Sequence, residues 1–153
     1  LAPADAREEQ VVRILRRQFG HPSAERALSG SGLVNLYSAL CEIDGVAARP
    51  LTPADVTALC ESDPQCRGAV EVFFSFLGNV AGNLALSLGA RGGMYIGGGI
   101  VPRLGDLIDR SLFRERFEDK GRFRGYLNAI PIWVVNARMS PALIGAARAL
   151  DDL

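Results

Sequence analysis

Residues 89–109 read GARGGMYIGGGIVPRLGDLID, and this glycine-rich stretch indicates the class of fold. Gly93 to Ile96 has the apolar character of a short buried strand, and the triplet Gly97–Gly99 follows it directly. Pro102 favours the first turn of a helix, which we expect to run to Arg110. Bare backbone between a strand and a helix is where α/β proteins can bring the main chain against a nucleotide. We therefore predict an α/β fold with a candidate nucleotide site at the triplet.

Helical patterns dominate the chain on both sides of this stretch. Asp5 and Glu8 have the spacing of a capping box, and Thr52 followed by Pro53 is a second helix-start signal. Ile132 to Val135 has the apolar character of a second buried strand. Apolar spacing and end signals predict helices at 5–19, 33–44, 53–59, 65–88, 112–117 and 141–150, the last capped by Ser140 with Leu143, Ile144, Ala147 and Leu150 facing the core. The fold is thus expected to be helix-rich, with a small sheet.

The segment from Gln65 to Leu88 is predicted to be the longest and most buried helix. Apolar residues cover so much of its circumference that it must lie at the centre of the fold. Its length approaches that of a membrane span, but Asn79 and Asn83 interrupt it and no aromatic belt flanks it, so we expect no membrane partner. Gly78 and Gly82 lie four residues apart on one face, which predicts close approach of another backbone.

The composition is that of one globular domain. Lys and Arg number 17, Asp and Glu also number 17, and 48% of the residues are hydrophobic. A balanced charge gives no general attraction to nucleic acid. The three cysteines lack the CxxC spacing of zinc or redox sites, so reduced thiols and a cytoplasmic location are expected, with a Cys60–Cys66 disulfide as the alternative.

The glycine triplet does not fit the common phosphate-binding motifs. No Gly-Lys-Ser/Thr follows it, which excludes a P-loop, and Pro102 stands where a dinucleotide fingerprint needs a third small residue. Flat backbone beside a helix start could still accommodate a sugar, a base or a phosphate. The alternative is a tight strand-to-helix turn with no ligand.

Three further features have a functional and a structural interpretation. Glu25 is a lone acid between a proline-containing entry and a Gly30–Gly32 loop, and as a lone acid it is as readily a solvated or capping residue. His21 has no second ligand at metal or catalytic-triad spacing, so no metal site is predicted. Residues 118–122 are expected to form a solvated charged turn with local ion pairs.

Four segments resemble the bacterial-type glucokinases of the hexokinase and actin-like ATPase superfamily. They occur in the family's order and at fitting distances, across almost the whole chain. The segments are SAERALSGSGLVNLY (23–37), GNLAL (82–86), GGMYIGGGIVPR (92–103) and FRERFEDKGRF (113–123).

The resemblance implies a function and a set of site residues. The family transfers the γ-phosphoryl group of ATP to the 6-hydroxyl of glucose, with Mg²⁺. By resemblance, Glu25 matches a carboxylate that accepts hydrogen bonds from glucose hydroxyls, which a charged acceptor suits. Gly97, Gly98 and Gly99 match the adenosine motif, and the Gly30–Gly32 loop is expected to border the same cleft.

The resemblance also implies that residues 1–153 are a C-terminal portion, part of the large domain of a ribonuclease H-like, actin-like ATPase fold. The family's aspartate base and first phosphate loop belong to an N-terminal half that this sequence does not contain. No catalytic residue is therefore predicted in this chain, which we expect to be inactive alone while its parent enzyme, a homodimer, is active. The alternatives are a non-catalytic helical interaction or dimerisation module, and a related kinase with another hexose as substrate.

Overall fold

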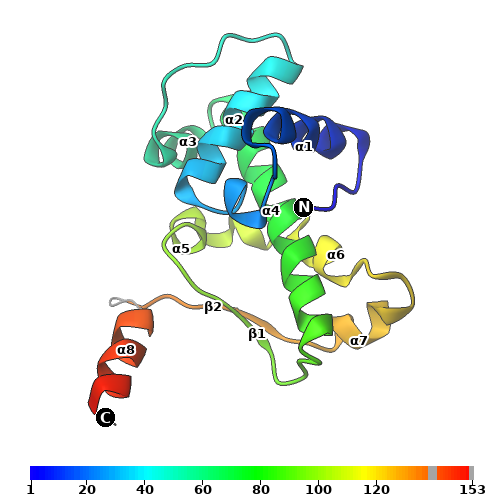
Figure 1. The fold of residues 1–153 in the computed structure, drawn as a ribbon, viewed down its shortest axis with the longest axis vertical. Coiled ribbons are helices and arrows are strands. Elements are labelled where there is room, and N and C mark those ends of the chain that lie inside the picture. Colours follow the sequence, from blue (N-terminus) through cyan, green and yellow to red (C-terminus); the bar gives the residue numbers. More distant parts are fainter. Residues whose placement is uncertain (138–140, 152–153) are drawn as a thin grey trace.

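One long helix, α4 (Pro64–Ser87), runs through the middle of the computed structural model, which describes residues 1–137 and 141–151. Figure 1 shows a helical group around the start of α4, shorter elements along the rest of this helix, and α8 apart from it. The first group comprises α1 (Ala6–Phe19), η1 (Ala24–Arg26), α2 (Gly30–Ile43) and α3 (Pro53–Leu59). The others are β1 (Met94–Ile96), α5 (Val101–Leu104), η2 (Gly105–Ile108), α6 (Phe113–Glu118), η3 (Gly121–Phe123), α7 (Arg124–Asn128), β2 (Ile132–Val134) and α8 (Pro141–Asp151).

The central position predicted for α4 is confirmed by its burial. Its core-facing residues include Phe73, Phe74 and Phe76, each at most 2% exposed. By length and composition alone α4 could cross a membrane, but 56% of its most apolar window is buried inside the fold, against α2, α3 and α6. This burial is what a core helix requires, because a lipid-facing helix would expose the same side chains.

Two glycines of α4 allow α6 to approach closely, as predicted. A Cβ added at Gly78 would lie closer than 3.0 Å to the carbonyl oxygen of Phe113, and one at Gly82 would meet that of Phe117 in the same way. Both carbonyls belong to α6, so the two helices touch backbone to backbone. Contacts this close leave no room for even one methyl group.

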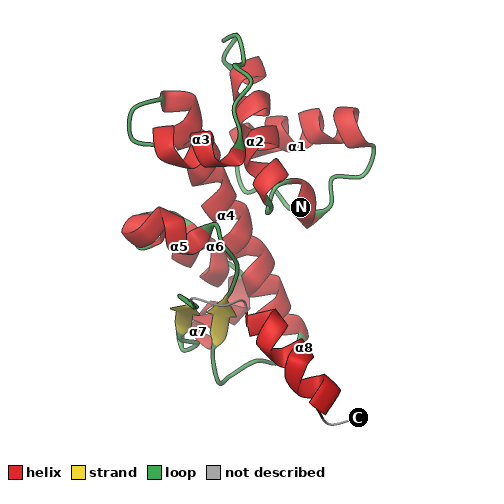
Figure 2. Ribbon diagram, turned by 90° about the vertical axis from the view of Figure 1, so that its left-hand side faces the viewer, coloured by secondary structure: helices red, strands yellow, loops and turns green. Residues whose placement is uncertain are grey.

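The two predicted strands form a parallel pair, with Met94 opposite Ile132 and Ile96 opposite Val134 (Figure 2). The Met94 amide donates to the Pro131 carbonyl and the Val135 amide donates to the Ile96 carbonyl, each at 2.9 Å. One face of the pair packs toward the core through Ile96. The other face carries the exposed Tyr95, whose ring stacks on Trp133 at a centroid separation of 4.8 Å.

Replacing Gly93 with alanine should disturb this aromatic stack. Gly93 has φ +139°, and a Cβ there would lie closer than 3.0 Å to the Trp133 ring, so we expect a loss of about 1–3 kcal/mol in unfolding free energy. Because Trp133 is the chain's single tryptophan, its fluorescence should shift as well. Gly92→Ala is the control, since a Cβ at Gly92 meets nothing within 4 Å. Equal behaviour of the two variants would contradict the packing described.

Several sequence predictions about the elements are wrong. The helix expected from Pro102 to Arg110 ends at Leu104, because Gly105 adopts φ +57° and starts a separate 3-10 turn, η2. The apolar residues of α8 do not face the core: Leu143 and Leu150 are 66% and 71% exposed, and Figure 1 shows α8 standing away from α4. The predicted cap at Ser140 lies outside the described residues.

Helix starts are largely as predicted. Thr52 and Asp55 form a complete capping box on α3. Asp5 accepts the Glu8 amide, but the Glu8 side chain does not return to Asp5; its carboxylate is buried, accepts from the Ala4 amide at 2.7 Å and receives a 2.5 Å hydrogen bond from Ser75. Glu8 therefore ties α1 to the central helix.

In the charged turn at residues 118–122, Asp119, Gly121 and Arg122 are exposed as predicted, whereas Glu118 and Lys120 are not. Glu118 is 8% exposed and pairs with Arg114. Lys120 lies over Gly82 and donates to the Asn79 side chain at 2.8 Å, and burial lowers the pKa of this lysine. Lys120 thus links the end of α6 to α4.

Asp63 should stabilise α4 in a pH-dependent way. Its carboxylate accepts the amides of Cys66 and Gln65, both at 2.9 Å, and these bonds, that of Cys66 first, lower the pKa of Asp63. A lowered folded-state pKa means that the stabilisation is present above about pH 4, the ordinary Asp value, and is lost as the pH falls through the folded value. Asp63→Ala should cost about 1 kcal/mol at pH 7, measured by denaturant unfolding, and the deficit should shrink at low pH. A deficit that does not change with pH would contradict this assignment.

Candidate functional site

Glu25 lies on η1, a single exposed turn between α1 and α2. Within residues 1–137 and 141–151, its carboxylate makes no hydrogen bond or ion pair; only its main-chain carbonyl is engaged, by Ser29. A carboxylate that the fold leaves unpaired and accessible retains its full capacity to accept hydrogen bonds. The sequence-based interpretation of Glu25 as a solvated residue is therefore correct. A side chain that accepts hydrogen bonds from a ligand needs the same exposure.

The backbone that carries Glu25 is held by three contacts from α2. Ser29 Oγ donates to the Glu25 carbonyl at 2.8 Å and accepts the Gly32 amide at 3.0 Å. Asn35 Nδ2 donates to the Arg26 carbonyl at 2.9 Å. A Cβ at Gly32 would meet the Ala27 backbone at less than 3.0 Å, so only glycine permits this contact. Glu25 is thus an exposed side chain on a fixed turn.

The Gly30–Gly32 segment is not the loop that the sequence predicted. It forms the first turn of α2, and Ser29 is the N-cap. Glycine usually weakens a helix, which is why the turn was misassigned, but here Gly32 is required by its contact with Ala27. The serine before the apolar repeat of α2 was the signal that could have located the cap.

Gly97, Gly98 and Gly99 lie exposed on the segment that leaves β1 toward α5 (Figure 1). A Cβ at any of the three would meet nothing within 4 Å, so packing within this chain does not require glycine there; Gly98 alone needs it, for a φ of +113°. In the described part of the chain, their three amides have no hydrogen-bond partner. The triplet therefore presents open backbone donors at the end of a strand.

The predicted role of a helix dipole beside the triplet is not supported. The helix that follows, α5, has four residues, and Gly105 ends it. The macrodipole results from aligned peptides over several turns, so α5 offers little of this field. Any ligand at the triplet would bind through the amides themselves.

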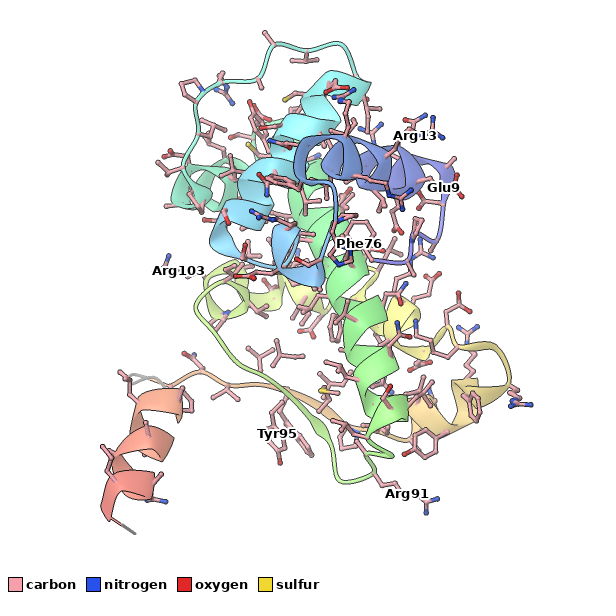
Figure 3. All side chains as sticks on the ribbon, viewed as in Figure 1. Glu9, Arg13, Phe76, Arg91, Tyr95 and Arg103 are labelled. Carbon is pink, nitrogen blue, oxygen red and sulfur yellow. The ribbon has the colours of Figure 1, made fainter. Side chains whose placement is uncertain are left out.

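A hollow at α5 was not predicted from the sequence. Its volume is about 180 Å³, and it lies between the end of α3 and α5–η2. Arg103, exposed on α5, points outward at its rim (Figure 3). Residues that line it are Thr57, Ala58, Cys60, Glu61, Arg103, Leu104, Asp106 and Leu107. The pairing of α3 with α5 across some 45 residues could not be read from spacing.

Metal and thiol chemistry find no support in the described residues. Residues 1–137 and 141–151 contain no group of three or more His, Cys, Asp and Glu side chains placed to hold a metal ion. Cys41, Cys60 and Cys66 are free and buried, and burial raises the pKa of the Cys66 thiol to about 11. A thiol so rarely ionised is a packing residue.

Comparison with known proteins identifies relatives along the entire chain. The glucokinase family model matches residues 1–153. A glucokinase of Nitrobacter hamburgensis is 56% identical over 96% of this chain and 46% of its own length. One of Chromobacterium violaceum is 53% identical over 99% of this chain and 44% of its own. The chain thus spans about half the length of the curated relatives it matches.

Solved structures show the same fold. A glucokinase from an Antarctic psychrotroph superposes with a TM-score of 0.88 at 35% identity, over all of this chain and 48% of that one. A glucokinase from Balamuthia mandrillaris, solved in complex with glucose, gives 0.75 over 91% of this chain and 41% of its own; at 23% identity it supports the fold alone. The predicted helix-rich α/β fold and the predicted family are both confirmed. The chain belongs to the glucokinase family and corresponds to a C-terminal portion of its members.

Proposed function

We propose that this chain supplies the sugar-binding carboxylate and the nucleotide-binding backbone of an ATP-dependent glucose kinase. The product would be glucose 6-phosphate. ATP, when bound, supplies the phosphoryl group, and Glu25 with Gly97–Gly99 would orient the two substrates. Family membership supports the reaction class, and the free carboxylate on a fixed turn is the observation that carries the proposal.

Glu25 would bind glucose through its carboxylate oxygens. Hydrogen bonds from sugar hydroxyls to an ionised carboxylate are stronger than those to a neutral acceptor. Because Ser29 and Asn35 already hold the Glu25 turn, little ordering is needed on binding, and a fixed acceptor orients the sugar more accurately than a mobile one.

The glycine triplet would bind the adenosine end of ATP. Three amides without partners in the described chain can donate to the nucleotide, and the absence of side chains lets it lie against the backbone. The hollow between α3 and α5–η2, lined by Arg103 four residues after Gly99, is the place we propose for the base. The triplet is thus proposed to bind the nucleoside part of ATP, with its amides as hydrogen-bond donors and its bare backbone as the contact surface.

Mg²⁺ and the base that takes the hydroxyl proton are not assigned to residues of this chain. Mg²⁺ in kinases is held largely by substrate phosphates and one or two carboxylates. The proposed N-terminal half would supply the base. Residues 1–153 are accordingly proposed to be one domain portion whose activity depends on the remainder.

A coupled assay on a full-length glucokinase that contains this chain tests the proposed reaction. Glucose 6-phosphate should form from ATP and glucose, with a higher kcat/KM for glucose than for fructose or mannose. A preference for another hexose would move the protein to the related sugar kinases. No turnover with any hexose would overturn the proposal and favour a non-catalytic interaction module.

The predicted homodimer also remains a proposal. The exposed Leu143, Ile144 and Leu150 of α8 are an apolar surface that could support association. Light scattering on the full-length protein and on this chain distinguishes two cases. A dimer in both supports a natural interface. If only the isolated chain associates, the association comes from surface that truncation uncovers.

A further inference from the structure

We infer that Arg114 is a positioning residue that sets the place of the glycine triplet by clamping the entrance to β2. The inference rests on the proposed nucleotide role of Gly97–Gly99. Arg114 lies on α6, and its guanidinium reaches the turn between α7 and β2. There it donates to the carbonyls of Asn128 at 2.7 Å and Ile130 at 2.9 Å, with a longer contact to Leu127 at 3.4 Å.

The guanidinium is itself held in place. Its Nε donates to the Glu118 carboxylate one turn further along α6, and its central carbon, Cζ, lies 5.4 Å from the centroid of the Phe117 ring. Glu118 also accepts from the Asn128 side chain at 3.1 Å, so the clamp and its target turn share one acceptor. Arginine can make this set of bonds because its five donors have a fixed planar arrangement.

The clamp is connected to the triplet through main-chain hydrogen bonds. Ile130, whose carbonyl Arg114 holds, is followed by Pro131, and the Pro131 carbonyl accepts the Met94 amide at the start of β1. At the other end, the Val135 amide holds the Ile96 carbonyl. Since β1 has three residues, fixing β2 fixes β1, and Gly97 follows immediately.

Two other contacts make α6 and α7 a stable frame for this clamp. The α6 backbone is seated on Gly78 and Gly82 of the central helix. The Tyr126 hydroxyl on α7 donates to the Ala90 carbonyl at 2.6 Å, just before β1. The N-terminal ends of β1 and β2 are therefore both held by contacts from α6 and α7. The proposed ligand site, Gly97–Gly99, follows the C-terminal end of β1.

Arg114→Lys is the variant that tests the clamp. Lysine keeps a positive charge beside Glu118, so the variant should fold. As a point charge it cannot donate to the Asn128 and Ile130 carbonyls together, so the clamp should be lost. Hydrogen exchange of the Met94 and Val135 amides in this chain should speed up roughly tenfold, because local opening loses charge-assisted bonds. Amides of α1 and α2 should not change. Arg122→Lys is the matched control, since Arg122 is exposed, lies over the Phe123 ring and makes no side-chain hydrogen bond or ion pair within residues 1–137 and 141–151.

Kinetics of the same variants in a full-length glucokinase test the functional end. Arg114→Lys should raise the KM for ATP several-fold and leave the KM for glucose unchanged, whereas general destabilisation would affect both. Unchanged exchange at Met94 and Val135 would overturn the clamp itself. Faster exchange with an unchanged KM for ATP would instead overturn the link between the clamp and nucleotide binding, without deciding whether Gly97–Gly99 bind the nucleotide.

Discussion

Replacing Glu25 with glutamine in a full-length glucokinase that contains this chain should raise the KM for glucose roughly 10- to 100-fold. A hydrogen bond to a charged group contributes about 1.5–3 kcal/mol, and each 1.4 kcal/mol is a factor of ten. Glutamine retains one oxygen but replaces the other with an amide that cannot accept, so a sugar hydroxyl loses its partner. The kcat should fall as well, because a less fixed sugar presents its 6-hydroxyl less accurately.

The KM for ATP and the stability of the protein should not change in this variant. Glu25 is exposed, and its side chain supports no contact in the described structure, so the fold does not depend on it. Glu9→Gln is the control: Glu9 is an exposed acid on α1 (Figure 3), without a side-chain hydrogen bond or ion pair among the described residues. An unchanged KM for glucose in Glu25→Gln would remove this residue from the site.

Replacing Gly78 with alanine should cost about 2–3 kcal/mol of unfolding free energy, a large part of the 5–15 kcal/mol typical of a domain. In an isolated helix this change would be favourable by about 1 kcal/mol. Here the new methyl group would meet the Phe113 carbonyl at less than 3.0 Å, with backbone on both sides. Because neither helix can shift a side chain out of the way, α6 must move off α4.

The measurement is denaturant unfolding of this chain, with Gly68→Ala as the matched control. Gly68 lies on the same helix, and its added Cβ would meet only the flexible end of Leu40, at 3.2 Å. The control should therefore be neutral or slightly stabilising. Equal stability of Gly78→Ala and Gly68→Ala would show that α4 and α6 are not in backbone contact.

Local patterns in the sequence predicted most of the elements correctly. Apolar spacing identified α4, end signals identified the starts of α1 and α3, and the apolar tetrads before Gly97 and after Pro131 identified both strands. The pair Gly78 and Gly82 was assigned correctly because small residues four apart share one helix face.

The errors arose where a tertiary contact changes the meaning of a residue. Gly32 was interpreted as part of a loop, although it lies in the first turn of α2 against Ala27. The turn at residues 118–122 was expected to be solvated, although Glu118 pairs with Arg114 and Lys120 donates to Asn79 on α4. The apolar spacing of α8 predicted a helix correctly, but its apolar side chains are exposed rather than facing the core. Periodicity alone does not show which element packs on a helix.

The candidate site was predictable only in part. The sequence resemblance selected Glu25 and the triplet, and the structure adds that both are accessible. In the described chain, the Glu25 carboxylate and the three glycine amides have no hydrogen-bond partner. Neither the hollow between α3 and α5–η2 nor the Arg114 clamp could be foreseen, since each joins residues that are distant in sequence or depends on carbonyl directions.

The central claim is that this chain contributes substrate contacts but not the complete catalytic machinery. The most direct measurement is glucose 6-phosphate formation by purified chain 1–153, in a coupled assay with saturating glucose, ATP and Mg²⁺, beside a full-length glucokinase that contains it. We predict no turnover above background for the chain and normal turnover for the full-length protein, because phosphoryl transfer needs a base, metal and phosphate contacts acting together. A rate for the chain near that of the full-length enzyme would contradict the account.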